Sequence, residues 1–370
     1  MDTERRNFTG QCDRFTDEHK RITEQSEFAA CLFLSILPCE NTVQVLIFVF
    51  VFLTIFSFLI NGLVLFGVSR SDDLSEEPQT MLLKNLILSD MLQTFSFGPA
   101  VIHSLRRRRT MIYGFWCNTQ YFVGTLSVFS SLVIITFMAL ERYLFVCQGI
   151  RYLVILTHRR QRLIQRLIWV CTFSIATIHL FALKIGSVNR QVTSGLLCEP
   201  DIMEQIFGFP HAAVGFRKIL STLSLFVCLL VYAFSYVNMY IVARNAAIPF
   251  NAVNTAARKT VLFYCGMLFL QLLPLLLKVV SDALWEIKGT VAMTVPDASQ
   301  SGNLTPSVTA TVLHLSLLVT LMVPPCVNPM VYGLKSDKIR LALRNSIRRF
   351  WDRIVADRNE NLELQTRRTG

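Results

Sequence analysis

Seven long apolar runs constrain this chain more than any other feature of its sequence. A helix needs about 20 mostly apolar residues to cross the hydrocarbon core of a bilayer. The runs occupy residues 43–69, 80–104, 116–146, 163–183, 213–243, 258–283 and 310–334. They do not show the short alternating segments that are typical of a membrane β-barrel. The pattern predicts an all-α membrane protein, a seven-transmembrane helix bundle at 43–334 between an N-terminal tail (1–42) and a C-terminal tail (335–370).

Composition excludes several other classes of protein. Hydrophobic residues make up 52% of the chain and charged residues 16%, against about 25% charged residues in soluble domains. The net charge of +11 on so apolar a chain favours membrane topology over nucleic-acid binding. Ten cysteines are too few for a disulfide scaffold of this length. The histidines are scattered, so no enzyme site is expected, and a transporter would show repeats or paired half-spans that the sequence lacks.

The basic residues that flank the runs predict that the N-terminus lies outside the cell. The tail from Lys335 to Arg368 contributes ten Lys and Arg to the inner side, and its apolar residues recur at helical spacing. A short amphipathic helix on the inner membrane surface is therefore expected after the last run. Arg106–Arg109 run counter to the excess of basic residues on the inner side, because they fall in the first outer loop. There they either contact lipid phosphates or attract anions. Asn7 and Asn303 head glycosylation sequons on the outer side.

A carboxylate lies near the middle of the second run. Asp90 is about 15 Å from the start of that run at 1.5 Å per residue, where an ionised group costs roughly 2.5–3.5 kcal/mol. Asn61, Ser131 and Asn328 lie at comparable depths in three other runs. A carboxylate with amide and hydroxyl oxygens suits a small hard cation such as sodium, or a water network. The alternative is that these groups only hold the helices together.

Charged and helix-breaking residues mark the inner ends of two runs. Glu141-Arg142-Tyr143 ends the third run, and Pro329 interrupts the seventh. A proline inside a spanning helix removes one backbone hydrogen bond and kinks the helix. We expect Asn328 to satisfy the freed carbonyl and Tyr332 to move between partners. Pro274 gives the sixth run a similar break, and kinked helices can act as the hinges that a signalling bundle needs.

These features, in this order, resemble those of rhodopsin-like (class A) G-protein-coupled receptors over residues 43–353. The motifs that carry the resemblance are Asn61, Leu86-x-x-x-Asp90, Cys117, Glu141-Arg142-Tyr143, Trp169, Tyr236, Pro274 and Asn328-Pro329-x-x-Tyr332. The stretches Met138–Cys147 and Asn328–Lys335 further resemble olfactory receptors. The second outer loop, 184–212, carries only Cys198, and the sixth run lacks the usual Ser-x-Cys-x-Ser-His stretch. The chain is thus most similar to the divergent odorant receptors of fishes and amphibians.

The resemblance implies a receptor that binds a small-molecule odorant and activates a heterotrimeric G protein of the stimulatory cyclic-AMP type. It implies a multi-pass protein of the plasma membrane, in the cilia of olfactory sensory neurons, in contact with membrane lipid and able to dimerise. No cofactor is expected apart from the sodium ion at Asp90. The alternative is a class A receptor for another small ligand or a lipid. The resemblance assigns G-protein coupling and activation to Glu141, Arg142, Tyr143, Tyr236, Asn328, Pro329 and Tyr332.

The resemblance also implies a disulfide and a ligand pocket. Cys117 and Cys198 are expected to pair, whereas the pairing of Cys12, Cys31 and Cys39 stays open. The pocket is assigned to the outer half of the bundle, with candidate residues Tyr121, Gly124, Thr125, Val128, Leu220, Ser224, Leu275, Lys278 and His314. Its apolar walls favour a small hydrophobic or weakly polar molecule.

Three residues at or near this predicted pocket bear on the kind of ligand. Gly124 stands where amine receptors carry an aspartate, and Met322 stands where opsins carry the retinal-binding lysine. The resemblance therefore argues against a biogenic amine and against retinal. Lys278 either pairs with Asp282 one turn later or binds an acidic odorant.

Overall fold

The structure is a computed structural model that describes the chain in segments. The described residues are 29–30, 33–34, 37, 40–69, 77–111, 114–149, 152, 156–186, 196–198, 211–246, 262–263, 265–277, 308–334, 337–345 and 348–349. The labelled elements are α3 (Glu40–Ser69), α5 (Pro78–Arg107), α6 (Phe115–Gln148), α8 (His158–Gly186), α10 (His211–Ala246), α12 (Val308–Asn328) and the π-helix η2 (Pro329–Leu334). Cys265–Leu277 is a shorter apolar helix, and residues 337–345 form a further short helix.

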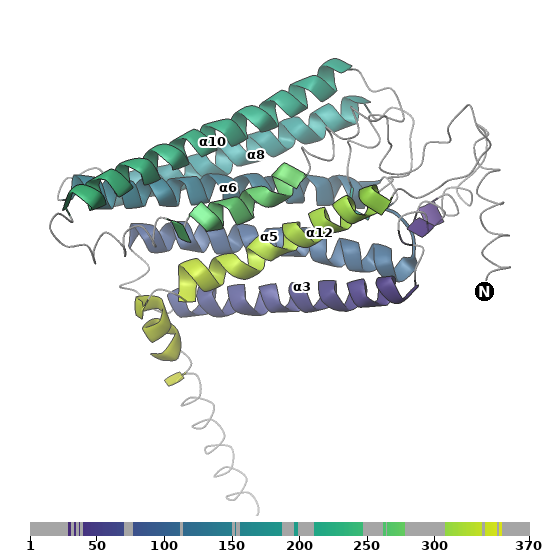
Figure 1. Ribbon diagram of the computed structural model, residues 1–370, viewed down its shortest axis with the longest axis horizontal. Helices are drawn as coiled ribbons and strands as arrows, with labels where there is room; N and C mark the ends of the chain where they lie inside the picture. The colour runs from purple at the N-terminus through teal and green to yellow at the C-terminus, as the bar shows by residue number, and fades with distance from the viewer. Residues whose placement is uncertain are drawn as a thin grey trace, which may run out of the picture.

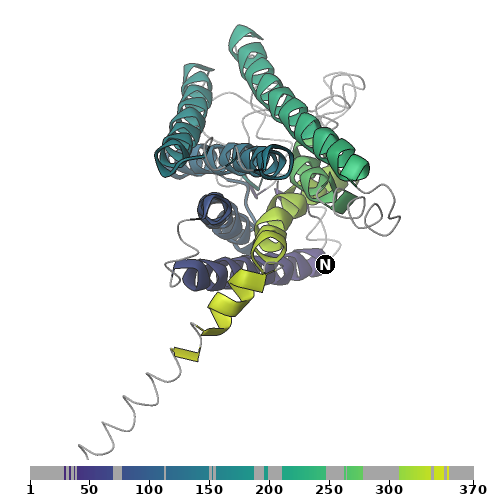
Figure 2. The same ribbon diagram turned by 90° about the vertical axis from the view of Figure 1, so that its left-hand side faces the viewer.

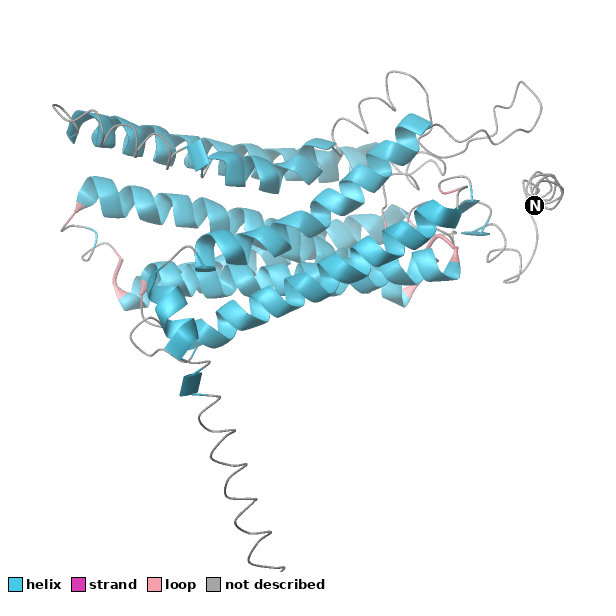
Figure 3. Ribbon diagram, turned by 60° about the horizontal axis from the view of Figure 1, so that its bottom comes forward, coloured by secondary structure: helices cyan, strands magenta, loops and turns pink. Residues whose placement is uncertain are grey.

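The long helices lie side by side along one axis (Figure 1). Within the segments described above, every regular element is a helix (Figure 3). Helix α6 contacts α5, α8 and α10, while α12 packs on α3 and α5. The view along the bundle shows the short helix 337–345 turning away from α12 (Figure 2). The chain is therefore an all-α seven-transmembrane bundle with a short helix after the last span, as the apolar runs predict.

Five of the described helices are long and apolar enough to cross a membrane. These spans are Glu40–Ser69, Phe115–Gln148, Arg159–Ala182, Lys218–Val242 and His314–Leu334. Helix α5, with 30 residues, is also long enough to cross a membrane. It is more polar than these five spans, because many hydrogen-bonding groups lie on its buried side. The buried polar residues of α5 are Thr80, Ser89, Asp90, Gln93, Thr94, Ser96 and Ser104. Ser89, Gln93 and Thr94 form hydrogen bonds to α6, α12 and α3 respectively, so hydrogen bonds contribute to the association of these helices beside apolar contact.

Two apolar clusters occupy opposite ends of the bundle. One includes Tyr236 and Tyr332 and lies at the end that carries Glu141, called here the Glu141 end. The other includes Leu197, next to Cys198 in the chain, and lies at the end that carries the Cys117–Cys198 disulfide, called here the disulfide end. The polar network around Asp90 therefore separates two apolar layers.

The described residues before α3 pack on the disulfide end of the bundle. Phe33 and Leu37 are buried in the second apolar cluster, and the Thr110 N–H donates to the Ala29 carbonyl over 3.1 Å. Arg108 forms an ion pair with Glu40 at the start of α3. At least one of the four consecutive arginines thus ties the end of α5 to α3.

Candidate functional site

Three of the four predicted intramembrane polar residues meet at one point. Asp90 on α5 is 0% exposed. Its Oδ1 accepts a hydrogen bond from the Ser131 hydroxyl of α6 over 3.2 Å. The Asn328 Nδ2 of α12 donates to Oδ1 and Oδ2 of Asp90 over 3.2 and 3.1 Å. The carboxylate therefore joins three helices, and α12 is held at the residue just before its helical register changes.

Asn61, the fourth predicted residue, binds the backbone of α12 instead of Asp90. In an α-helix each N–H donates to the carbonyl four residues earlier. Pro329 has no N–H, so it leaves the Pro325 carbonyl without its helical donor. The Asn61 Nδ2 of α3 donates to that carbonyl over 2.8 Å. The expectation that Asn328 would satisfy the freed carbonyl was wrong, because the Asn328 amide is already bound to the buried carboxylate of Asp90.

A second side chain, Gln93, acts in the same way one turn earlier. Pro325 likewise has no N–H and frees the carbonyl of Leu321. The Gln93 Nε2 of α5 donates to that carbonyl over 2.6 Å. Pro325 of α12 and Pro329 of η2 are thus each matched by one amide, from α5 and α3 respectively, so the carbonyls of Leu321 and Pro325 stay paired.

A group of hydroxyls surrounds the carboxylate on the α6 side. The Ser89 hydroxyl of α5 lies 2.6 Å from that of Ser130 and 2.9 Å from that of Ser131. Carboxylate and hydroxyl oxygens are ligands that hard cations prefer, so Asp90 and its neighbours fit a small cation. Buried polar residues that the sequence reasoning missed are Ser57, Ser89, Gln93, Thr94 and Ser130. Gln93 could have been found from the sequence, because its amide lies at the same depth as the Leu321 carbonyl that Pro325 leaves without a donor.

At the Glu141 end, the Glu141 carboxylate is bound by a residue that lies between α6 and α8. The Tyr152 hydroxyl donates to Glu141 Oε1 over 2.7 Å. Burial, together with this hydrogen bond, raises the pKa of Tyr152 above its ordinary value, so the hydroxyl keeps its proton and stays a donor at neutral pH. Tyr152 therefore fixes the acidic member of the Glu141-Arg142-Tyr143 motif.

The other predicted activation residues make aromatic contacts. The Arg142 guanidinium lies 5.4 Å from the centre of the Tyr332 ring, within cation–π range. Tyr143 meets Phe234 of α10 edge to face, and the ring of Tyr236 lies 4.5 Å from that of Tyr232. Tyr332 belongs to η2, so the contact of Arg142 joins the base of α6 to the π-helical turn that follows Pro329.

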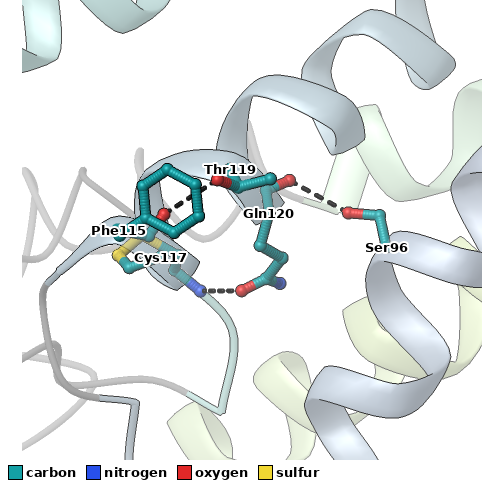
Figure 4. Close-up of a disulfide and its surroundings, with 6 residues drawn as sticks. Ser96, Phe115, Cys117, Thr119 and Gln120 are labelled. Carbon is teal, nitrogen blue, oxygen red and sulfur yellow. Dashed lines mark hydrogen bonds between the residues drawn. A yellow bond between two sulfur atoms is a disulfide. The ribbon is translucent and has the colours of Figure 1, made fainter.

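The disulfide end is closed by the predicted bridge. Cys117 of α6 and Cys198 form a disulfide with a Cα–Cα distance of 5.2 Å, across a separation of 81 residues. Figure 4 shows Gln120 beside it. The Gln120 Oε1 accepts from the Cys198 N–H over 3.2 Å, and its carbonyl accepts from the Ser96 hydroxyl over 2.9 Å. Gln120, which sequence reasoning missed, thus links the bridge to α5.

The predicted pocket residues are distributed over four helices. A Cβ at Gly124 would lie 2.7 Å from two ring carbons of Phe97, so this glycine allows α5 and α6 to approach closely. Half-buried candidates are Tyr121, Thr125 and Val128 on α6, Leu220 and Ser224 on α10, and Leu275 on the helix Cys265–Leu277, while His314 on α12 is buried. Lys278 lies outside the described residues, as do the sequon residues Asn7 and Asn303 and the cysteines Cys12, Cys31 and Cys39. The pocket assignment stays a prediction.

Comparison with known proteins agrees with this architecture. Residues 60–332 match the family described as 7 transmembrane receptor (rhodopsin family). Human olfactory receptor 2G3 is 22% identical over 324 residues, which cover 81% of this chain and 90% of that protein. Human olfactory receptor 10A5 is 25% identical over 344 residues, or 91% of this chain and 97% of that protein. Human melanopsin is 25% identical over 296 residues, or 76% of this chain and 57% of that protein.

Proposed function

Because the chain belongs to the rhodopsin family of seven-transmembrane receptors, we propose that it is an odorant receptor that activates a stimulatory, cyclic-AMP-linked G protein. Proteins of this family are receptors and not enzymes. The similarity to human olfactory receptors over most of both chains supports the odorant class. Met322, which is fully buried, offers no amine for a Schiff base, and this argues against the light sensing that the likeness to melanopsin would suggest.

The observation that carries the proposal is the path of contacts along α12 and η2. His314 lies buried in the outer part of α12, Asn328 binds Asp90 midway, and Tyr332 contacts Arg142 at the Glu141 end. A ligand that shifts the outer part of α12 acts on a helix whose backbone is already broken by proline, so movement can reach Tyr332. Arg142 then leaves its resting contacts and meets the G protein.

The proposal includes an orientation and a location. The disulfide end faces the outside of the cell, with glycans on Asn7 and Asn303, and the Glu141 end faces the cytoplasm. The receptor acts in the plasma membrane of the cilia of olfactory sensory neurons and can form dimers there.

Co-expression with the stimulatory G protein of olfactory neurons tests the function. Cells that make the receptor are expected to raise cyclic AMP in a dose-dependent way with at least one compound of a volatile and water-borne odorant panel. The variant Arg142→Ala should respond to none of them at equal surface expression. Cyclic-AMP responses confined to a panel of endogenous lipids would instead favour the alternative, a class A receptor for a non-odorant ligand.

We further propose that Asp90 and Ser131 hold a sodium ion. An ion that binds only the folded receptor stabilises it, by about 1.4 kcal/mol when sodium is tenfold above its dissociation constant. Purified receptor is therefore expected to unfold at a higher temperature in sodium chloride than in choline chloride of equal ionic strength. The variant Asp90→Asn keeps an oxygen for the Ser131 hydroxyl but loses the charge, and it should show no such difference. Equal sodium stabilisation of both proteins would exclude this site.

A further inference from the structure

A partly open cavity of about 270 Å³ lies between α5, α6 and α8 at the Glu141 end. Its lining changes character with depth in the membrane. Leu82, Phe137 and Ile164 line the part nearer the middle of the bundle. Glu141 and Gln161 line the part nearer the end of the helices, since α6 ends and α8 begins there. The cavity is therefore mainly apolar, with Leu144 and Leu156 also at its mouth, and its polar residues lie only at that mouth. This is the order in which a lipid presents its chain and headgroup.

The side-chain oxygen of Gln161 is a buried hydrogen-bond acceptor at this cavity. This residue is 7% exposed, and its Nε2 donates to the Leu156 carbonyl over 2.9 Å. The Gln161 Oε1 is buried and has no hydrogen-bond partner in the part of the chain that the structure describes. A buried acceptor left alone is unfavourable, so the cavity fits a molecule that brings an N–H or O–H group.

The charges at the mouth narrow the choice further. Glu141 lines the same cavity as Gln161, and an acidic residue there favours a donor that carries a positive charge. Arg160 also lines the cavity and is exposed to its surroundings, and a guanidinium at that rim suits a phosphate. A lipid with an ammonium beside a phosphate therefore fits this cavity. Its ammonium matches Gln161 and Glu141, its phosphate matches Arg160, and its hydrocarbon chain matches the apolar part.

We propose that this cavity binds a phosphatidylethanolamine from the leaflet at the Glu141 end. The ammonium donates to Gln161 Oε1 and Glu141, the phosphate contacts Arg160, and an acyl chain fills the space between Leu82, Phe137 and Ile164. Phosphatidylcholine has the same phosphate and chains, but its nitrogen carries three methyl groups and no N–H. The site therefore discriminates between the two lipids by hydrogen bonding alone.

Competitive lipid retention tests this site without any need for odorant or G protein. The full chain is reconstituted in vesicles of equimolar dioleoyl phosphatidylethanolamine and dioleoyl phosphatidylcholine, extracted in mild detergent, and weighed by native mass spectrometry. The wild type is expected to retain phosphatidylethanolamine at least threefold over phosphatidylcholine. Equal retention of the two lipids would overturn the proposal and would mean that water satisfies Gln161.

Two independent variants and one control make the test specific. Gln161→Met removes the acceptor at similar size and should bring the retention ratio to about one. Ile164→Phe leaves Gln161 in place but narrows the apolar part, and it should lower the retention of phosphatidylethanolamine itself. Ser174→Ala on the same helix removes an exposed hydroxyl that donates to the Val170 carbonyl of α8, and it should keep the wild-type ratio. An unchanged ratio in Gln161→Met would place the bound lipid elsewhere.

Discussion

Cys117→Ser is expected to remove most of the folded receptor from the cell surface. The bridge joins the start of α6 to Cys198 across a separation of 81 residues, and loss of a native disulfide typically costs about 2–5 kcal/mol. The loss extends beyond the bridge, because the backbone N–H of Cys198 is bound by Gln120. Freeing Cys198 therefore weakens the packing of Leu196 and Leu197 in the second apolar cluster.

Surface labelling of an N-terminal epitope, divided by the total receptor in the same cells, measures this effect. The surface fraction of Cys117→Ser should fall more than fivefold below that of the wild type. The double variant Cys117→Ser/Cys198→Ser should be no worse than either single variant, because the two sulfurs act only as a pair. Cys171→Ser, which changes an exposed free cysteine of α8, is the matched control. A similar loss in that control would show that the assay reports on any cysteine change rather than on the bridge.

The sequence was sufficient to predict the bundle, because the length of an apolar run decides whether a helix crosses a membrane. It also predicted that Asp90, Ser131 and Asn328 lie at one depth in the membrane, because the rise per residue of an α-helix converts a position in the run into a depth. It could not decide which amide meets which partner. Asn61 and Asn328 lie at similar depths, and only the rotation of each helix about its axis determines that the first faces a freed carbonyl and the second faces Asp90.

Contacts made by segments outside the long helices were not predictable from periodicity. Tyr152 lies between α6 and α8, and nothing in the spacing of apolar residues indicates that its hydroxyl reaches Glu141. Phe33 and Leu37 belong to a stretch too short to span the membrane, and both are buried against the disulfide end. Gly124 was assigned to the pocket from its place on α6, whereas its lack of a side chain also makes room for Phe97.

Gln93→Leu is expected to destabilise the receptor only as long as Pro325 is present. In the wild type the substitution leaves the Leu321 carbonyl buried without its donor, which costs about 1–3 kcal/mol. Pro325→Ala restores an N–H four residues after Leu321, so the carbonyl regains a helical partner. The same Gln93→Leu change should then cost much less. Gln93 Oε1 is itself buried without a hydrogen-bond partner among the described residues, but removing it contributes equally in both backgrounds and cancels from the comparison.

A double-mutant cycle on the unfolding midpoint of the purified receptor measures this coupling. Gln93→Leu should lower the midpoint by several degrees in the wild type and by clearly less in Pro325→Ala. Pro329→Ala is the matched control, because Pro329 frees the carbonyl of Pro325, which Asn61 binds, and not that of Leu321. Gln93→Leu and Pro329→Ala should therefore be additive, whereas Asn61→Leu and Pro329→Ala should be coupled. If Gln93→Leu proved equally costly beside either proline change, its amide would stabilise α12 by packing and not by replacing the hydrogen bond that Pro325 removes.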